Sequence, residues 1–156
     1  YELWIFGTGD YEDTVKKISK ENTKIKYFGL VTHSEIIEYE SKATLLINPR
    51  PSIEEFTKYS FPSKTIEYMA SGTPLLTTQL PGIPEEYWKY VYTFNDESVD
   101  GMAKTIDRIL CKTSEELNAF GEKARKYIIN NKNYIVQTEV ILDFLEKLIS
   151  KTKNYK

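Results

Sequence analysis

Residues 62–77 read PSKTIEYMASGTPLLT, and this stretch decides the fold. Pro62 suits the first turn of a helix, because its missing N–H would have no intrahelical partner there. Gly72 suits the left-handed residue that follows a helix, and Pro74 prevents the helix from continuing. A short apolar run follows at once. The stretch therefore predicts a helix over residues 62–71 that a tight turn joins to a strand over residues 74–77.

The same alternation of short apolar runs and amphipathic stretches extends through the first 95 residues. The runs are almost wholly apolar, as expected of parallel strands that are covered by helices on both faces. Repeated strand–helix–strand order predicts an α/β fold with a doubly wound parallel sheet. The expected strands are 3–6, 25–28, 43–47, 74–77 and 90–94, and the expected helices are 11–20, 33–41 and 62–71, with a short turn near 84–88.

After residue 94 the pattern is helical only, with three apolar stripes at helical spacing. We expect one folding domain over residues 1–150, ending in these helices, and a frayed lysine-rich tail over residues 151–156. Cys111 lies in a stretch rich in Leu and Ile, so we expect it to be a small core residue.

Composition argues against several classes of protein. The 156 residues carry 21 Lys and Arg against 23 Asp and Glu, a net charge of −2, which lacks the basic excess of a nucleic-acid binder. No apolar run approaches the roughly 18 residues of a membrane span. The single Cys cannot form an internal disulfide, and with the single histidine, His33, it cannot supply an ordinary zinc site. We expect His33 to be a surface residue at a helix start rather than a catalytic one.

The most informative candidate site is the start of the helix at residues 62–71. In an open parallel sheet, ligands bind outside the carboxyl ends of the strands, where this helix begins. The N–H groups of Ser63 and Lys64 are expected to be free there. Free amides and the helix dipole attract an anion, and the Lys64 side chain adds a positive charge, so the natural ligand is a phosphate.

Glu67 lies about one turn into the same helix. Its carboxylate can accept hydrogen bonds from two vicinal hydroxyls, such as those of a ribose beside a diphosphate. It can equally be an exposed glutamate that the helix dipole favours. The spacing alone leaves both readings open.

Two other loops give weaker signals. Gly7-Thr8-Gly9 lacks the third glycine of a dinucleotide-binding fingerprint, and Asp10 is expected to cap the next helix. Glu85 or Glu86 stands at a short helix start, where capping is favoured over contact with a ligand.

Several blocks together resemble a known family. FPSK at residues 61–64, EYMASG at 67–72 and PGIPE at 81–85 are similar to the C-terminal half of GT-B glycosyltransferases. The similarity is to the glycosyl group 1 family (family 4, retaining) and its capsule and surface-polysaccharide members. It implies a Rossmann-like nucleotide-sugar-binding domain with trailing helices. It also implies that the chain lacks the first strand–helix unit of this domain and an N-terminal acceptor domain.

The resemblance implies roles for residues that would contact a nucleotide-sugar donor. The family often has another glutamate eight positions before Glu67, in contact with the donor sugar, and this chain has Tyr59 there. The contact with the donor sugar is therefore open between Tyr59, Glu55 and Glu54. The implied donor contacts are Glu67 to the ribose; Ser63, Lys64 and Thr65 to the diphosphate; and Gly29, Leu30 and Val31 to the nucleobase.

The implied activity is transfer of a sugar from a nucleoside-diphosphate sugar to a glycan or lipid-linked acceptor in surface polysaccharide biosynthesis. No metal or other cofactor is expected. No catalytic residue is identified, because the base would come from the absent domain, and the fragment alone is expected to be inactive. A cytoplasmic location is implied, and peripheral association of the full enzyme with the inner face of the membrane is left open.

Three alternatives also remain open at this point. One is a sugar-nucleotide epimerase of related fold. Another is a signalling domain of the receiver type, which requires an acidic residue at the end of the third strand, where Asn48 stands. The last is an α/β domain that binds glycans or partners without chemistry.

Overall fold

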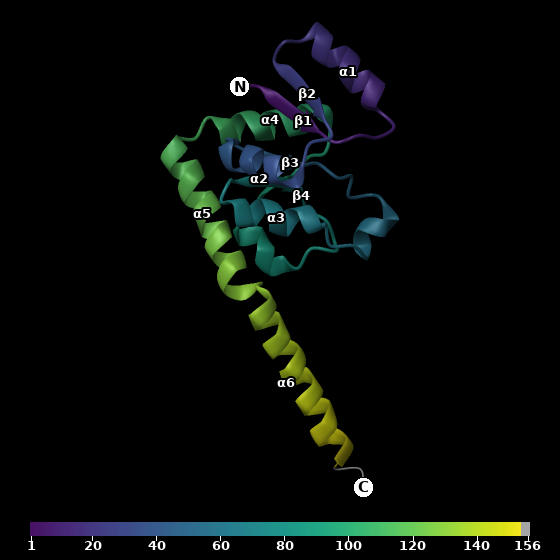
Figure 1. Cartoon of the computed structure of the whole chain (residues 1–156), viewed down its shortest axis with the longest axis vertical. Helices are drawn as coiled ribbons and strands as arrows, with labels where there is room; N and C mark the ends of the chain where they lie inside the picture. The colour runs from purple at the N-terminus through teal and green to yellow at the C-terminus, as the bar shows by residue number, and fades with distance from the viewer. Residues whose placement is uncertain (154–156) are drawn as a thin grey trace. The chain divides into compact units, whose positions relative to one another are not determined.

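The computed structural model describes residues 1–153 of the chain (Figure 1). The chain divides into two compact units, unit 1 at Tyr1–Tyr39 and unit 2 at Glu40–Lys156. The division falls within helix α2 (His33–Lys42). Each unit is described by itself.

Unit 1 holds a parallel pair of strands, β1 (Leu3–Phe6) and β2 (Ile25–Gly29), joined by α1 (Glu12–Glu21). Four aromatic side chains pack together here. Phe6 stacks on Phe28 with ring centroids 4.7 Å apart, and Tyr39 of α2 lies 4.8 Å from Phe6 and 5.6 Å from Trp4. This aromatic cluster attaches the first part of α2 to the strand pair.

The helix starts of unit 1 correct one expectation. The residue that caps α1 is Tyr11, which makes no side-chain capping bond, so the prediction that Asp10 caps this helix is wrong. At α2, Glu35 Oε2 accepts from the Thr32 N–H at 2.8 Å, and Thr32 Oγ1 accepts from the Glu35 N–H at 3.3 Å. His33 is exposed, as predicted.

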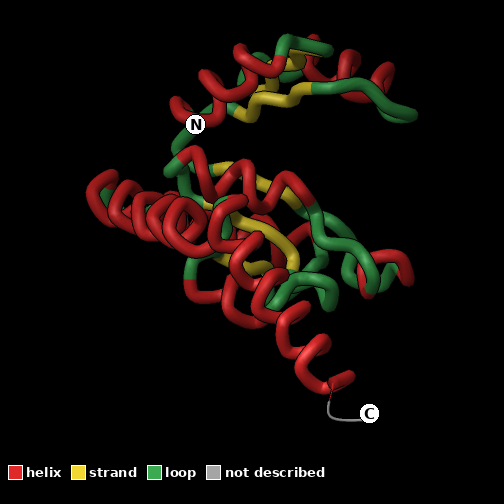
Figure 2. The backbone as a smooth tube through the Cα atoms, turned by 60° about the horizontal axis from the view of Figure 1, so that its bottom comes forward, coloured by secondary structure: helices red, strands yellow, loops and turns green. Residues whose placement is uncertain are grey.

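Unit 2 is built on a parallel sheet in the order β3-β4-β5. β4 is central, and its two leucines and two threonines are all buried, as expected of a strand that is covered on both faces. Figure 2 shows the strands of this sheet between helices. The elements of unit 2 are β3 (Leu46–Asn48), η1 (Glu55–Lys58), α3 (Ser63–Ser71), β4 (Leu75–Thr78), η2 (Glu85–Lys89), β5 (Tyr92–Phe94), α4 (Val99–Leu110), α5 (Ser114–Asn131) and α6 (Tyr134–Lys153), where η1 and η2 are short 3-10 helices.

Local signals at the helix ends hold these elements in place. Gly72 follows α3 with φ 85°, the left-handed conformation predicted for it. Pro62 is the N-cap residue of α3, whose first helical residue is Ser63, whereas we expected Pro62 itself to lie in the first turn. α5 begins with a capping box, in which Thr113 and Glu116 each accept a hydrogen bond from the other's N–H.

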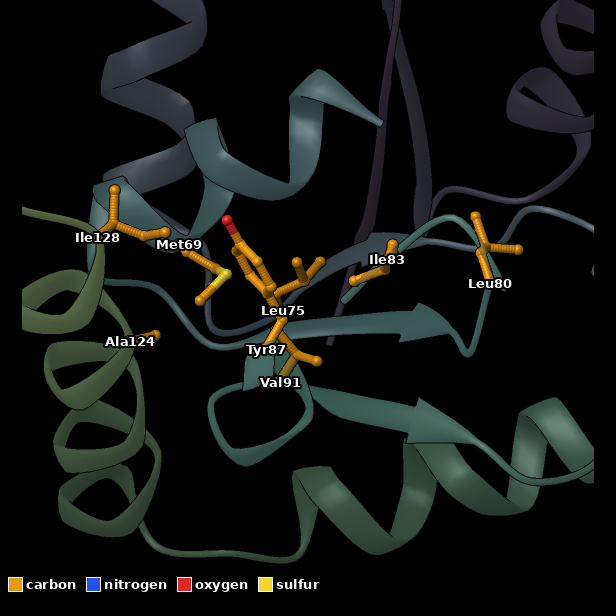
Figure 3. Packing of buried hydrophobic residues seen from close by; sticks show 8 residues of the cluster. All are labelled: Met69, Leu75, Leu80, Ile83, Tyr87, Val91, Ala124 and Ile128. Carbon is orange, nitrogen blue, oxygen red and sulfur yellow. The ribbon is translucent and has the colours of Figure 1, made fainter. Parts of the chain in front are cut away.

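The main core of unit 2 lies between α3, β4 and α5. Figure 3 shows eight of its side chains, with Ala124 and Ile128 on α5 facing Met69 on α3. A second cluster lies under α4 and holds Leu76, Phe94, Ile109 and Leu117. The two clusters fix the helices on the sheet and thereby position the loops at its edge.

The structure confirms the predicted α/β class of parallel strands flanked by helices. The strands lie in two sheets, and the third and fifth begin at Leu46 and Tyr92, later than expected. Cys111 is exposed, so its assignment to the core is wrong: it caps the C-terminus of α4, where the chain leaves the helix.

The last helix, α6, extends away from the sheet of unit 2 (Figure 1). Many of its large apolar side chains are exposed, among them Phe144 and Leu148. α6 continues to Lys153, and residues 154–156 of the predicted tail lie outside the described residues. Among residues 1–153, no helix is both long and apolar enough to span a bilayer.

Candidate functional site

The candidate site lies at the carboxyl edge of the sheet in unit 2. β3 and β4 are parallel neighbours that end at Asn48 and Thr78, so their following loops leave from the same edge. Hydrogen bonds join these loops. The Gly82 N–H donates to the Thr57 carbonyl at 3.0 Å. The loop after β3 is also joined to the segment after β5, because the Ser52 N–H donates to Glu97 at 2.9 Å.

Gly82 permits a close approach between two of these loops. A Cβ at this position would overlap the carbonyl oxygen of Ser60 and lie 2.7 Å from that of Thr57. Both obstacles are backbone atoms, so a side chain could not be accommodated by rotation of a neighbour. The loop that leads into α3 is therefore held against the loop after β4.

We expect Gly82→Ala to lower the free energy of unfolding by about 1–3 kcal/mol, because the added methyl group overpacks this loop contact. Urea unfolding followed by circular dichroism measures the loss. Glu85→Ala, an exposed change at the first residue of η2, is the control and should stay near wild type. Equal stability of Gly82→Ala and wild type would show that the two loops are not held together in this way.

The start of α3 presents free backbone donors to this edge. Within the described part of the chain, the N–H groups of Ser63 and Lys64 have no hydrogen-bond partner, and both residues are exposed. The Thr65 N–H differs, because it donates to the Pro62 carbonyl at 2.9 Å, and the Thr65 side chain is fully buried. Of the three residues expected at the diphosphate, Ser63 and Lys64 thus present donors at the surface.

Glu67 and Lys64 lie side by side one turn apart on α3. Lys64 Nζ is 3.4 Å from Glu67 Oε1, and it also lies over the Tyr68 ring, 5.6 Å from its centroid. The Glu67 side chain is 29% exposed and that of Lys64 is 45% exposed, so both charged groups reach solvent. The structure therefore brings the predicted phosphate and ribose residues together on one short helix.

Several buried polar atoms around this edge lack a hydrogen-bond partner among the described residues. A buried polar group without a partner is uncommon and is often completed by a ligand or an ordered water. Two of these atoms stand at the ends of the adjacent strands β3 and β4, namely Asn48 Nδ2 and Thr78 Oγ1. Two more are Ser60 Oγ, in the loop before α3, and Thr65 Oγ1, in the first turn of α3.

Glu40 is a buried acidic residue that the sequence interpretation did not single out. It stands in the last turn of α2, is only 6% exposed, and its Oε1 has no hydrogen-bond partner among residues 1–153. Burial, and then the charge and hydrogen bond of the Glu67 carboxylate, raise the pKa of Glu40 to about 7, against the opposing effect of Lys64. The available signal was its position four residues after Ile36, on the apolar face of a helix.

The residues expected at the donor sugar lie in an exposed segment. Glu55 is in η1 and Tyr59 follows it, with Tyr59 83% exposed. The structure shows no hydrogen bond or ion pair from either side chain to Glu67 within the described residues. Their role stays a prediction.

The segment expected at the nucleobase belongs to unit 1 and follows β2. Gly29 has φ 66°, and the next residue, Leu30, is 77% exposed. An exposed leucine at the carboxyl end of a strand offers an apolar surface. Within unit 1, the Gly7 N–H donates to the Gly29 carbonyl at 2.7 Å, so this segment is tied to the loop after β1.

The loop after β4 differs from the expectation. Pro84 caps η2 without a side-chain hydrogen bond, so the prediction that Glu85 or Glu86 caps this helix is wrong. Glu86 instead pairs with Lys132 at 2.6 Å. Among the described residues, no group of three or more His, Cys, Asp or Glu side chains is placed to hold a metal ion.

Comparisons with solved structures match this fold to longer proteins. Sucrose-phosphate synthase from Thermosynechococcus elongatus is 18% identical with a TM-score of 0.68, over 96% of this chain and 39% of that one. TarM is 24% identical with a TM-score of 0.68, over 94% and 28% of the two chains. AviGT4, a glycosyltransferase involved in avilamycin A biosynthesis, is 13% identical with a TM-score of 0.54, over 84% and 42%. The chain thus spans less than half the length of these structures.

A search of curated proteins finds no match. The family model of glycosyl transferases group 1 matches residues 1–112, which include Ser63, Lys64 and Glu67. The fold agrees, because the structural neighbours are GT-B glycosyltransferases. The chain therefore belongs to the glycosyl transferases group 1 family.

Proposed function

We propose that unit 2 binds the diphosphate and ribose of a nucleoside-diphosphate sugar for a glycosyltransferase. The observation that carries the proposal is the start of α3, where free N–H groups, an ammonium and a carboxylate share one exposed turn. Ser63 and Lys64 would hold the diphosphate, and Glu67 would accept hydrogen bonds from the ribose hydroxyls. The family match favours this reading over the epimerase and receiver alternatives.

The proposed contacts would also assist the reaction. When the sugar leaves, negative charge accumulates on the diphosphate, so donors that hold the product-like state more tightly lower the barrier. The amides of Ser63 and Lys64, the dipole of α3 and the Lys64 ammonium are such donors. These groups of the chain itself would therefore stabilise the negative charge that accumulates on the diphosphate.

The remaining parts of the proposal concern the whole enzyme. We propose a retaining transfer to a glycan or lipid-linked acceptor in surface polysaccharide biosynthesis, supported by the resemblance of residues 61–72 to that family branch. The acceptor would bind to another domain, since this chain spans 39% and 28% of two similar structures. The whole enzyme would be cytoplasmic.

Lys64→Ala separates the diphosphate contact from other donor contacts. We expect a loss of affinity for uridine or guanosine diphosphate of about fivefold or more, because a charge-assisted contact is removed, with little change for uridine or guanosine. Titrations by NMR, which detect millimolar binding, measure both. Lys126→Ala removes an exposed lysine from α5 and is the control. Equal losses for nucleoside and diphosphate would argue against the phosphate role of Lys64.

A further inference from the structure

A short segment beside the candidate site carries large apolar side chains in solvent. We call residues 53–59 the η1 tip. It follows β3 and holds Ile53, Phe56 and Tyr59, whose side chains are 87%, 54% and 83% exposed. Figure 1 shows this segment at the side of unit 2, away from the strands. Exposed apolar side chains that gather in one place mark a surface that contacts another molecule.

The two aromatic residues lie on the same side of the η1 tip. Phe56 is in the 3-10 helix η1, and Tyr59 is its C-cap residue, whose N–H donates to the Phe56 carbonyl at 3.1 Å. Side chains three residues apart in a 3-10 turn lie nearly above one another. Neither ring contacts another aromatic ring of the described residues, so both are available to a ligand.

Hydrogen bonds fix the backbone of the η1 tip. Thr57, which lies between the two aromatic residues, is fully buried, and its hydroxyl donates to the Glu54 carbonyl at 2.6 Å. The Thr57 carbonyl accepts from the Gly82 N–H at 3.0 Å, and the Ser52 N–H donates to Glu97 at 2.9 Å. Because the backbone is held in this way, the two rings are exposed by the fold itself.

Two carboxylates accompany the aromatic rings. Glu54 and Glu55 are exposed, and within the described part of the chain neither carboxylate has a hydrogen bond or an ion pair. A carboxylate accepts hydrogen bonds from hydroxyl groups, and an aromatic ring offers a broad apolar face. A pyranose sugar matches both, because it has hydroxyls around its edge and C–H groups on its faces.

Other occupants fit the η1 tip less well. A stable protein interface buries about 800 Å² on each partner, which is more than a few side chains on one short loop can supply. Anionic lipids at a bilayer surface would repel the Glu54 and Glu55 carboxylates. A carbohydrate is the ligand that uses the aromatic rings and the carboxylates together.

The η1 tip is also close to the proposed diphosphate site. Tyr59 stands four residues before Ser63, and four residues of chain span at most about 14 Å. The sugar of a donor whose diphosphate lies at Ser63 would therefore be near the η1 tip. The acceptor has to reach that same sugar, and the exposed rings of Phe56 and Tyr59 meet a molecule that approaches from solution.

We propose that Phe56 and Tyr59 hold the terminal sugar of a carbohydrate acceptor beside the donor. This inference rests on the proposed function, which puts the donor's diphosphate at the start of α3. The two rings stack on the apolar face of the acceptor sugar, and Glu54 and Glu55 accept hydrogen bonds from its hydroxyls. Another domain holds the rest of the acceptor. The acceptor class is thus a glycan or glycoside whose last sugar contacts this chain.

Sugar titrations of the ¹⁵N-labelled chain in the presence of UDP test this assignment. The probes are maltotriose, chitotriose and lactose, and we expect at least one of them to shift the amide resonances of Phe56 and Tyr59 with millimolar affinity. Phe56→Ala and Tyr59→Ala should each weaken that binding about threefold or more, because a stacking ring is lost. Tyr59→Phe keeps the ring and should stay within about twofold of wild type.

Tyr134→Ala is the matched control. It removes a tyrosine that is 81% exposed, against 83% for Tyr59, from α6 rather than from the η1 tip. Its affinity for the same sugar should equal that of wild type. A loss in Tyr134→Ala as large as that in Tyr59→Ala would overturn the assignment to the η1 tip.

The remaining outcomes separate the acceptor site from the donor site. No shift at Phe56 or Tyr59 with any of the three sugars, or binding that survives in both alanine variants, would overturn the acceptor role. Larger shifts there with UDP-glucose than with UDP, while no free sugar moves them, would also overturn it, because the rings would then contact the donor sugar. Sugar binding at the η1 tip without any response of Ser63 and Lys64 to UDP would overturn the proposed function and leave a carbohydrate-binding tip in place.

Discussion

Glu67→Ala is expected to weaken the binding of uridine or guanosine diphosphate by about 1.5–3 kcal/mol, or roughly tenfold and more. The reason is the loss of a charged acceptor from a half-buried position, where the two ribose hydroxyls would otherwise donate to it. Lys64, its neighbour at 3.4 Å, is left without this partner but is 45% exposed and can be hydrated. Isothermal titration calorimetry of the variant against wild type measures the difference.

Nucleotides without ribose hydroxyls make this test specific. The 2′,3′-dideoxy forms of the same diphosphates cannot donate to Glu67, so Glu67→Ala should lose little affinity for them. Glu139→Ala removes an exposed carboxylate on α6 and controls for the change in net charge. An equal loss for ribose and dideoxyribose nucleotides would show that Glu67 acts through general electrostatics or folding rather than through the ribose.

Gly121→Ala should destabilise the protein by about 2 kcal/mol or more, although alanine normally favours a helix by about 1 kcal/mol over glycine. A Cβ at Gly121 would overlap the carbonyl oxygen of Gly72 and lie 2.8 Å from the Gly72 carbon and 3.0 Å from the Pro74 nitrogen. All three are backbone atoms of the turn between α3 and β4. To relieve the overlap, α5 would have to move off α3 and open the main core.

Thermal unfolding followed by circular dichroism measures this effect. We expect the melting temperature of Gly121→Ala to fall by roughly 5–10 °C. Gly9→Ala is the matched control, because a Cβ there meets no atom within 4 Å and the substitution adds the same methyl group. A melting temperature at or above that of wild type for Gly121→Ala would show that helix propensity outweighs the contact, and that α5 does not pack this closely on the turn.

Local signals were sufficient to predict most of the fold. The two ends of α3 were predicted closely, because Pro62, Gly72 and Pro74 each restrict the backbone at their own position. The apolar run of β4 was recognised because this strand is buried throughout. The third strand was predicted too early, at residue 43, because an apolar pattern does not show where hydrogen-bonded pairing with Leu75 begins. Cys111 was wrongly assigned to the core, because the Leu-rich and Ile-rich composition around it does not show that α4 ends there.

The candidate site was predictable only where its residues are close in sequence. Ser63, Lys64 and Glu67 share one helix, so spacing alone places them on neighbouring turns. Glu40 was not singled out because its burial depends on how the end of α2 packs in the folded chain, which its neighbours in the sequence do not show. The capping prediction for Asp10 failed because the loop ends one residue later, at Tyr11.

Amide chemical shifts test most directly whether the start of α3 binds the diphosphate of a nucleotide sugar. In a titration of the ¹⁵N-labelled chain with UDP-glucose and GDP-mannose, the amide resonances of Ser63 and Lys64 should move most within unit 2, because their N–H groups are free to donate. The shifts should be much smaller in Lys64→Ala. Unchanged Ser63 and Lys64 resonances while another surface responds, or no response to either compound at millimolar concentration, would show that the start of α3 does not bind the diphosphate.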